Sequence, residues 1–325
     1  MTTLPIITQL LQSKEPLIRL KTYRTLLDHE LDTVEVKKIC RDLKQKSPIV
    51  QQLFKDLPQG NSSLPYDVYH KWHGAHWIMA ILADLEYPPQ DKTLIPSRDA
   101  ELEWLLSDHH WKRTPILEGR RRFCASIEGN AIFALTKLGL DDGRCAQLIQ
   151  RLQDYQWEDG GWNCDKHPKA CHSSYNESLI PYRALIHYHH THPSPSLAQT
   201  IERASEVFLK RKLYVSQHTQ LPIHPKWIQL SYPSYWHYNI LNALKILGEG
   251  EKLKDPRCQP ALDILVSKRL PDGGFPAEIR YYLGKEGRNH SPVHWGGVAK
   301  RKMNPWVTLD ALHVLKMANL MDFEP

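Results

Sequence analysis

The sequence predicts an all-α protein in which about six inner and six outer helices close into an α/α toroid. Apolar residues recur at i, i+3, i+4 and i+7 throughout the 325-residue chain, whereas alternating β-branched runs are scarce. A mostly apolar helix also recurs roughly every 50 to 70 residues, a spacing typical of repeat architectures. These observations favour a ring of stacked helix pairs over a sheet-containing fold.

Two kinds of helix alternate from about residue 66 onward. The apolar kind is expected around five aligned leucines, namely Leu82, Leu135, Leu185, Leu244 and Leu315. Amphipathic helices are expected between them, at about 99–106, 144–156, 197–212 and 258–268. Since a helix that is apolar all round is buried and one with a charged face lies outside, the alternation predicts concentric layers. An open solenoid would also fit; closure is favoured because the inner helices begin with polar and aromatic residues that suit a lined cavity.

The N-terminal part offers two further helices, Leu17–His29 and Val34–Lys44, the second after Thr33 as a plausible N-cap. We therefore expect two regions. Residues 1–65 form a helical segment that packs on the barrel or completes it, and residues 66–325 form the α/α-barrel repeats.

Composition narrows the class of protein. The hydrophobic fraction is 41% and the charged fraction 24%, as in globular proteins, and no apolar run approaches the roughly 20 residues of a membrane span. The net charge of +6 comes without a basic helix stripe, so nucleic-acid binding is not indicated. The first residues do not resemble a signal peptide, which makes the cytoplasm the expected location. Six scattered cysteines then predict thiols, metal ligands or core residues rather than disulfides. The oligomeric state stays open.

One loop concentrates residues that can bind a metal. An Asp159-Gly160-Gly161-Trp162 turn precedes it, and a helix is expected from about Ser173. Thiolate, imidazole and carboxylate are the groups that zinc takes in tetrahedral array. The loop offers Cys164, Asp165, His167, Cys171 and His172. The alternative is a solvated loop whose cysteines pack as small apolar residues.

The segments YQWEDGGWNCDK and KRLPDGGFPAE resemble the Gln-Trp-type repeats of terpenoid cyclases, whose α/α-toroid architecture is shared by the β subunits of protein prenyltransferases. The resemblance implies an enzyme acting on an apolar, isoprenoid-type substrate in a central cavity, although the DxDD and DDxxD motifs are absent. In prenyltransferases an Asp-x-Cys and a His bind zinc. The matching positions here are Lys169-Ala170-Cys171 and His237, so Lys169 stands where the aspartate is expected. The expected zinc ligands are therefore Cys164, Asp165, Cys171 and His237.

The predicted catalytic group combines this loop with the second inner helix. Glu128, facing a lined cavity, would have a raised pKa and act as an acid. Asp165 would be a second acid–base group, and Cys124 and His237 complete the set. The alternative is that Glu128 pairs with a basic neighbour and Cys124 belongs to the core.

Substrate contacts are expected at three places. Arg120, Arg121 and Arg122 precede an inner helix and suit an anionic head. Histidines and aromatic residues would line the cavity and stabilise cationic species, although ordinary core packing explains them equally well. These residues are His73, His76, Trp77, Trp236, Asn239, Trp306 and Asp310. Two other functions remain open: a non-catalytic lipid or peptide binding module on the same barrel, and a zinc-dependent enzyme of non-terpenoid chemistry, since lanthionine cyclases use a comparable toroid.

Overall fold

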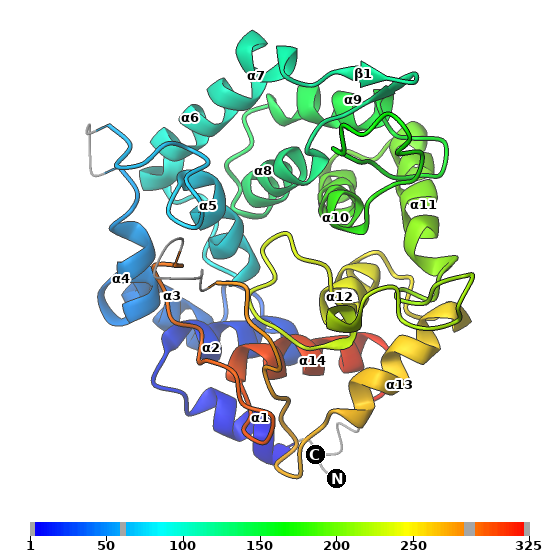
Figure 1. The fold of residues 1–325 in the computed structure, drawn as a ribbon. Coiled ribbons are helices and arrows are strands. Elements are labelled where there is room, and N and C mark those ends of the chain that lie inside the picture. The colour runs from blue at the N-terminus through cyan, green and yellow to red at the C-terminus, as the bar shows by residue number, and fades with distance from the viewer. Residues whose placement is uncertain (1–3, 59–62, 283–289, 322–325) are drawn as a thin grey trace.

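The computed structural model describes residues 4–58, 63–282 and 290–321. Its helices form two concentric rings around a common axis (Figure 1). The inner ring consists of α2 (Pro16–Lys21) with its continuation η1 (Thr22–Leu26), α5 (Ala75–Asp84), α8 (Ala125–Lys137), α10 (Tyr175–Thr191), α12 (Ile240–Glu249) and α14 (Pro305–Met317). The outer ring consists of α1 (Leu4–Leu11), α3 (Val34–Lys46), α6 (Ile95–Leu106), α9 (Cys145–Asp154), α11 (Pro195–Leu209) and α13 (Gln259–Ser267).

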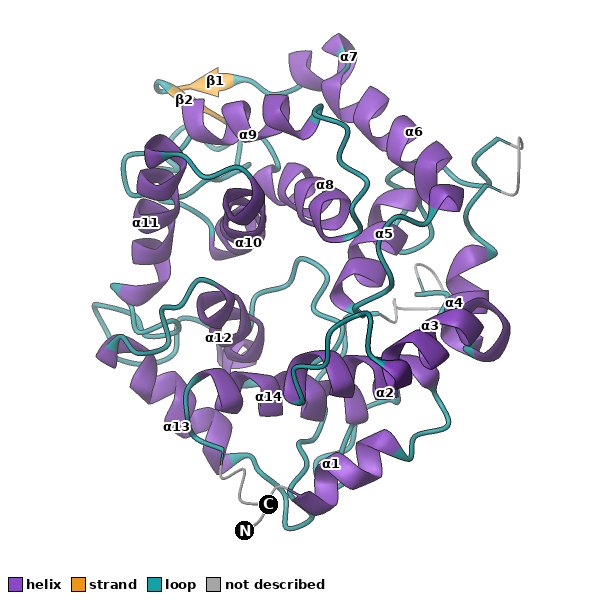
Figure 2. Cartoon of the chain, turned by 180° about the vertical axis from the view of Figure 1, so that it is seen from behind, coloured by secondary structure: helices purple, strands orange, loops and turns teal. Residues whose placement is uncertain are grey.

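Short elements connect the two rings (Figure 2). They are α4 (Pro48–Phe54), η2 (Lys92–Leu94), α7 (Asp108–Lys112), η3 (Pro225–Ile228), η4 (Pro256–Cys258) and the strands β1 (Ile116–Leu117) and β2 (Arg120–Arg121). The strands pair antiparallel, with Ile116 opposite Arg121.

The inner ring closes on itself. Consecutive inner helices contact one another from α5 through α8, α10 and α12 to α14, and α14 contacts both α2 and η1. An ion pair between Lys21 of α2 and Asp84 of α5 spans the remaining junction. The predicted all-α toroid, with closed rather than open ends, is therefore confirmed. The division of the chain at residue 65 stays a prediction.

Burial follows the two helix types that the sequence distinguishes. α10 buries apolar residues on nearly all sides, and Ser174 caps its start by accepting a hydrogen bond from the Glu177 backbone N–H. On the outer helix α9, by contrast, only one stripe is buried, which includes Leu148 and Leu152. Inner helices thus form the core, and outer helices cover it with one apolar face.

The two Asp-Gly-Gly-aromatic turns attach an outer helix to the next inner helix. Gly160 has φ +104°, and a Cβ atom there would collide with the Arg203 carbonyl oxygen of α11. Trp162 is fully buried and donates its indole N–H to the Leu152 carbonyl oxygen at 3.0 Å. Its backbone N–H donates to Ser178 Oγ, and Phe275 of the second turn donates in the same way to Thr308 Oγ1. The shared motif is therefore explained by packing within the toroid.

The tightest junction between inner helices lies where α8 crosses α10. A Cβ atom on Gly129 would stand 2.7 Å from the backbone nitrogen of Pro181, which is too close for any other residue. Because Gly129 lets the two backbones meet, α8 and α10 hold the residues at their N-terminal ends close together. None of the described helices is both long and apolar enough to cross a bilayer.

Candidate functional site

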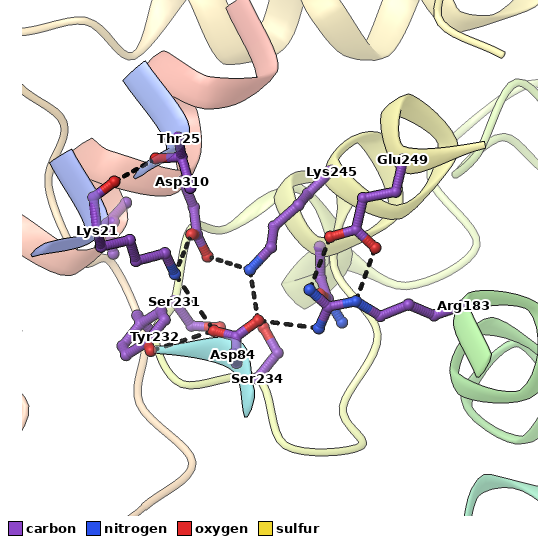
Figure 3. A network of polar contacts seen from close by, with 12 residues as sticks. Lys21, Thr25, Asp84, Arg183, Ser231, Tyr232, Ser234, Lys245, Glu249 and Asp310 are labelled. Atoms are coloured by element: carbon purple, nitrogen blue, oxygen red, sulfur yellow. Dashed lines mark hydrogen bonds and ion pairs between the residues drawn. The ribbon is translucent and has the colours of Figure 1, made fainter. Parts of the chain in front are cut away.

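A network of buried charges lies at the centre of the ring (Figure 3). Asp84 Oδ1 accepts hydrogen bonds from Lys245 Nζ at 2.6 Å and from an Arg183 guanidinium nitrogen at 2.9 Å. Its Oδ2 accepts from Lys21 Nζ at 3.3 Å and from the Tyr232 hydroxyl at 3.1 Å. Burial by itself would raise the pKa of Asp84, but the three cations hold it well below its usual range.

Two further carboxylates complete this central network. Asp310 of α14 pairs with Lys21 at 2.7 Å and with Lys245 at 3.1 Å. Glu249 of α12 accepts a bidentate pair of hydrogen bonds from Arg183, both 2.7 Å long. The three carboxylates thus balance the three cations, and five inner helices are tied together through ionic contacts.

A small cavity of about 40 Å³ adjoins this central network. The loop before α12 contributes part of its wall with Tyr232, Pro233, Ser234 and Tyr235. The aromatic and aliphatic lining residues include Trp77, Ile81, Phe133 and Ile180, and the polar ones are Asp84, Asn130, Arg183, Ser234, Asn242, Lys245 and Asp310.

Asn130 is the unusual member of this lining. Its residue exposure is only 5%, and it lies on α8 among buried neighbours. Among the described residues, none forms a hydrogen bond with its side-chain amide. The amide atoms of Asn130 are not among the fully shielded side-chain atoms that lack a partner, so they are accessible to a ligand in the cavity.

A second cluster lies where α8 and α10 begin. The ligand atoms of Cys124, Cys164 and Glu177 all lie within 4.8 Å of one another. Cys124 immediately precedes α8, Glu177 is in the first turn of α10, and Cys164 belongs to the loop between α9 and α10. Cys164 Sγ lies 3.5 Å from Glu177 Oε1, while the Ser126 backbone N–H donates to Oε2 at 3.0 Å. We call these three residues the thiol–carboxylate cluster.

The thiol–carboxylate cluster sits one helical turn beyond the cavity. Glu177 precedes Ile180 by three residues on α10 and shares a helix face with it, and Ile180 lines the cavity. Glu177 is 7% exposed, Cys164 is half-buried and Cys124 is exposed. The cluster therefore leads from the surface toward the interior of the ring.

Glu128, the predicted acid, does not line the cavity. It is 1% exposed and pairs with Arg151 of the outer helix α9 at 3.4 Å. Burial raises its pKa to about 7, although Arg151 opposes that shift. The expectation that Glu128 faces the cavity is therefore wrong, because its position on α8 points between the two rings.

This raised pKa predicts a pH-dependent stability. The folded chain retains the Glu128 proton up to about pH 7, whereas the unfolded chain loses it near the ordinary value of 4.5. Stability should therefore fall as pH rises through this window, by up to about 3 kcal/mol. We expect Glu128→Gln to flatten the pH profile measured by urea unfolding between pH 4.5 and 8. Glu103→Gln, an exposed site on α6, is the matched control; a Glu128→Gln profile parallel to that of the wild type contradicts the assignment.

The two predicted histidines also serve structure. His76 is fully buried and its Nδ1 lies 2.6 Å from Glu101 of α6, between the rings. His73 lies 2.6 Å from Asp56 and 2.8 Å from the His290 carbonyl oxygen. Neither lines the cavity, whereas their neighbour Trp77 does.

The three consecutive arginines contact aromatic rings and donate hydrogen bonds to carbonyl groups. Arg121 stacks over Trp111 and Tyr155, and Arg122 stacks over Trp157 while donating to the Ala170 carbonyl oxygen at 2.9 Å. Arg120 lies over the same Trp157 ring. Arg120 and Arg121 belong to the β1–β2 hairpin, whereas Arg122 is 1% exposed and its Nε and Nη1 have no hydrogen-bond partner among the described residues. The site for an anionic head therefore stays a prediction.

The predicted residues at the start of α12 and within α14 lie in different environments. His237 stacks between Trp236 and Tyr281, and burial lowers its pKa to about 4. Asn239 caps α12 and binds two serine hydroxyls. Trp306 stacks on Tyr232 at 5.5 Å, and of this predicted group only Asp310 lines the cavity.

The four expected zinc ligands do not come together. Asp165 and Cys171 are exposed on the loop, and Asp165 accepts a hydrogen bond from the His167 backbone N–H. Within the described part of the chain, three His, Cys, Asp or Glu side chains come close enough to hold one metal ion only at Cys124, Cys164 and Glu177. The structure thus retains Cys164 from the expected set, adds Cys124 from the predicted catalytic set, and adds Glu177, which the sequence interpretation missed.

Comparison with known proteins does not assign this chain to a family. No family model matches the chain, and neither does any curated protein. A solved structure described as a possible member of the GH105 family, from Salmonella enterica subsp. enterica serovar Paratyphi A, is similar with a TM-score of 0.45 and 12% sequence identity. The similarity covers 94% of this chain and 81% of that chain. At this level of similarity, neither substrate nor reaction transfers to this chain.

The resemblance to terpenoid cyclases and protein prenyltransferases is corrected by these findings. No model of those families matches, and the similar solved structure is described as a possible GH105 member. The physical reason is that the Asp-Gly-Gly-aromatic turn forms the contact between an outer and an inner helix. Gly160 and Trp162 serve that contact whatever reaction the ring supports.

Proposed function

We propose that the protein is an enzyme that binds a small, uncharged, polar molecule in the central cavity. The observation that carries this proposal is the Asn130 amide, which lies at the cavity wall without a hydrogen-bond partner among the described residues. Asn242, on α12, offers a second amide to the same cavity. Ligand pockets typically combine apolar and aromatic walls with a few polar groups that fix orientation, and this cavity has both.

The charge balance of the cavity supports an uncharged ligand. Asp84 and Asp310 are neutralised by Lys245 and Arg183. With Lys21 and Glu249 included, the network has as many positive as negative charges. A charged ligand would therefore meet no excess of opposite charge and would lose its hydration on entering. Hydroxyl or amide groups of a small ligand would instead hydrogen-bond to the asparagines.

A test starts from thermal shifts with a panel of uncharged hydroxyl- and amide-bearing compounds, alongside apolar and charged compounds of similar size. We expect stabilisation by members of the first group. For such a compound, Asn130→Leu should weaken binding at least about tenfold, because the ligand loses a buried hydrogen bond worth roughly 1.4 kcal/mol. Gln147→Leu, an exposed amide on α9, is the control and should leave affinity unchanged. Stabilisation confined to apolar or charged compounds contradicts the proposal.

A binding module without catalysis is the second candidate, because a cavity can serve either role. The thiols of Cys124 and Cys164 near the cavity favour the enzyme, because thiol groups can serve as metal ligands. For a ligand found in this way, Cys124→Ser should preserve binding and remove turnover. If turnover survives this substitution, the thiol–carboxylate cluster does not take part in catalysis.

A further inference from the structure

We propose that Cys124, Cys164 and Glu177 bind one zinc ion at the mouth of the toroid. The inference goes beyond the proposed function, since it adds a Lewis-acid centre to a cavity whose ligand binding does not depend on it. Two soft thiolates and one hard carboxylate suit zinc, a borderline ion, better than magnesium or calcium, which prefer oxygen ligands alone.

The spacing of the three side chains fits a tetrahedral ion. Bonds of about 2.3 Å place two sulfur ligands of zinc roughly 3.8 Å apart. The observed separation of 3.5 Å between Cys164 Sγ and Glu177 Oε1 is already close to such an edge. All three ligand atoms lie within 4.8 Å of one another, so small side-chain rotations close the remaining distance.

The environment of Glu177 gives an independent reason for a cation. The other carboxylates of comparable burial each have a basic partner: Glu101 has His76, Glu128 has Arg151, and Asp310 has Lys21. Within the described part of the chain, by contrast, no Lys, Arg or His nitrogen lies within 4.0 Å of the Glu177 carboxylate. A buried carboxylate without a compensating charge is costly, and a divalent ion supplies that charge.

The surroundings also orient the carboxylate. The Ser126 backbone N–H donates to Glu177 Oε2, which leaves Oε1 on the side of Cys164. Such outer hydrogen bonds fix the ligands of metal sites. Cys124 lies at the N-terminal end of the 13-residue helix α8 and is the exposed member of the cluster.

Three protein ligands leave one tetrahedral position for water or for a substrate atom. Sites of this kind are catalytic rather than structural, because structural zinc sites fill all four positions with protein ligands. The ion would lie near the cavity, since Glu177 is one helical turn from Ile180, which lines it. The ion would therefore polarise a carbonyl group of a bound molecule or lower the pKa of a coordinated water molecule.

The test measures metal binding by the full-length protein. Reduced, metal-free protein is titrated with zinc in competition with a chromophoric chelator, and with cobalt as a spectroscopic substitute. We expect one zinc ion per chain and a sulfur-to-cobalt charge-transfer absorption. Cys164→Ser and Glu177→Gln should each weaken zinc binding at least about 100-fold, the upper end of the effect seen for outer-shell partners alone. Glu177→Gln retains an oxygen that accepts the Ser126 N–H.

Matched controls separate the site from general thiol binding. Cys171→Ser removes an exposed cysteine of the same loop, and Asp165→Asn removes the carboxylate next to Cys164; both should bind zinc like the wild type. Asn130→Leu should also bind zinc normally, which distinguishes this inference from the cavity proposal. A folded wild-type protein that binds no stoichiometric zinc or cobalt overturns the inference. So does a Cys171→Ser variant that loses as much affinity as Cys164→Ser.

Discussion

Asp84→Asn is expected to lower the free energy of unfolding by about 3–5 kcal/mol, the range for removing one partner of a buried ion pair. The neutral amide leaves Lys21, Lys245 and Arg183 with less negative charge than positive charge at the centre of the ring. Urea unfolding with a fitted m-value measures the change. Because these groups connect five inner helices, the substitution weakens the closure of the ring itself.

Two further variants test whether the loss of stability is specific to the central network. Asp142→Asn removes a carboxylate near the surface that pairs with Arg144, and it should cost less than about 1 kcal/mol. Adding Lys245→Met to Asp84→Asn should recover part of the lost stability, because it removes one of the uncompensated cations. Equal losses for Asp84→Asn and Asp142→Asn would contradict a structural role for the central network.

Trp162→Ala is expected to cost about 3–5 kcal/mol, as large-to-small substitutions of buried aromatic residues do. The indole is fully buried and its N–H satisfies the Leu152 carbonyl oxygen at the end of α9. Trp236→Ala removes a partly buried indole that stacks on His237, and it should cost clearly less. Thermal and urea unfolding measure both variants. If the two substitutions cost the same, the Asp-Gly-Gly-Trp turn does not attach the outer ring to the inner ring.

The architecture could be predicted because it depends on local patterns. Helices that are apolar all round became the inner ring, and helices with one apolar face became the outer ring. The positive φ of Gly160 and the burial of Trp162 follow from a motif that is visible in the sequence. The all-α toroid was therefore predictable without knowledge of any distant contact.

The site was predictable only in part, because it depends on how the ring brings distant helices together. Asp84, Arg183 and Lys245 are charged residues within mostly apolar helices, and that anomaly was the available signal for the central network. Cys164 and Asp165 are sequence neighbours, yet Cys164 points toward Glu177 while Asp165 caps its own exposed loop. Spacing within the loop thus favoured Asp165 and Cys171 as metal ligands and gave no indication of Glu177.

The central claim is that the functional centre lies where α8 and α10 begin, beside the cavity. Anomalous diffraction at the zinc edge, from crystals of reduced protein grown with equimolar zinc, tests it most directly. We expect one strong peak bonded to Cys124 Sγ, Cys164 Sγ and a carboxylate oxygen of Glu177. A peak at Asp165, Cys171 or His237, or no peak between the three predicted ligands, would contradict it.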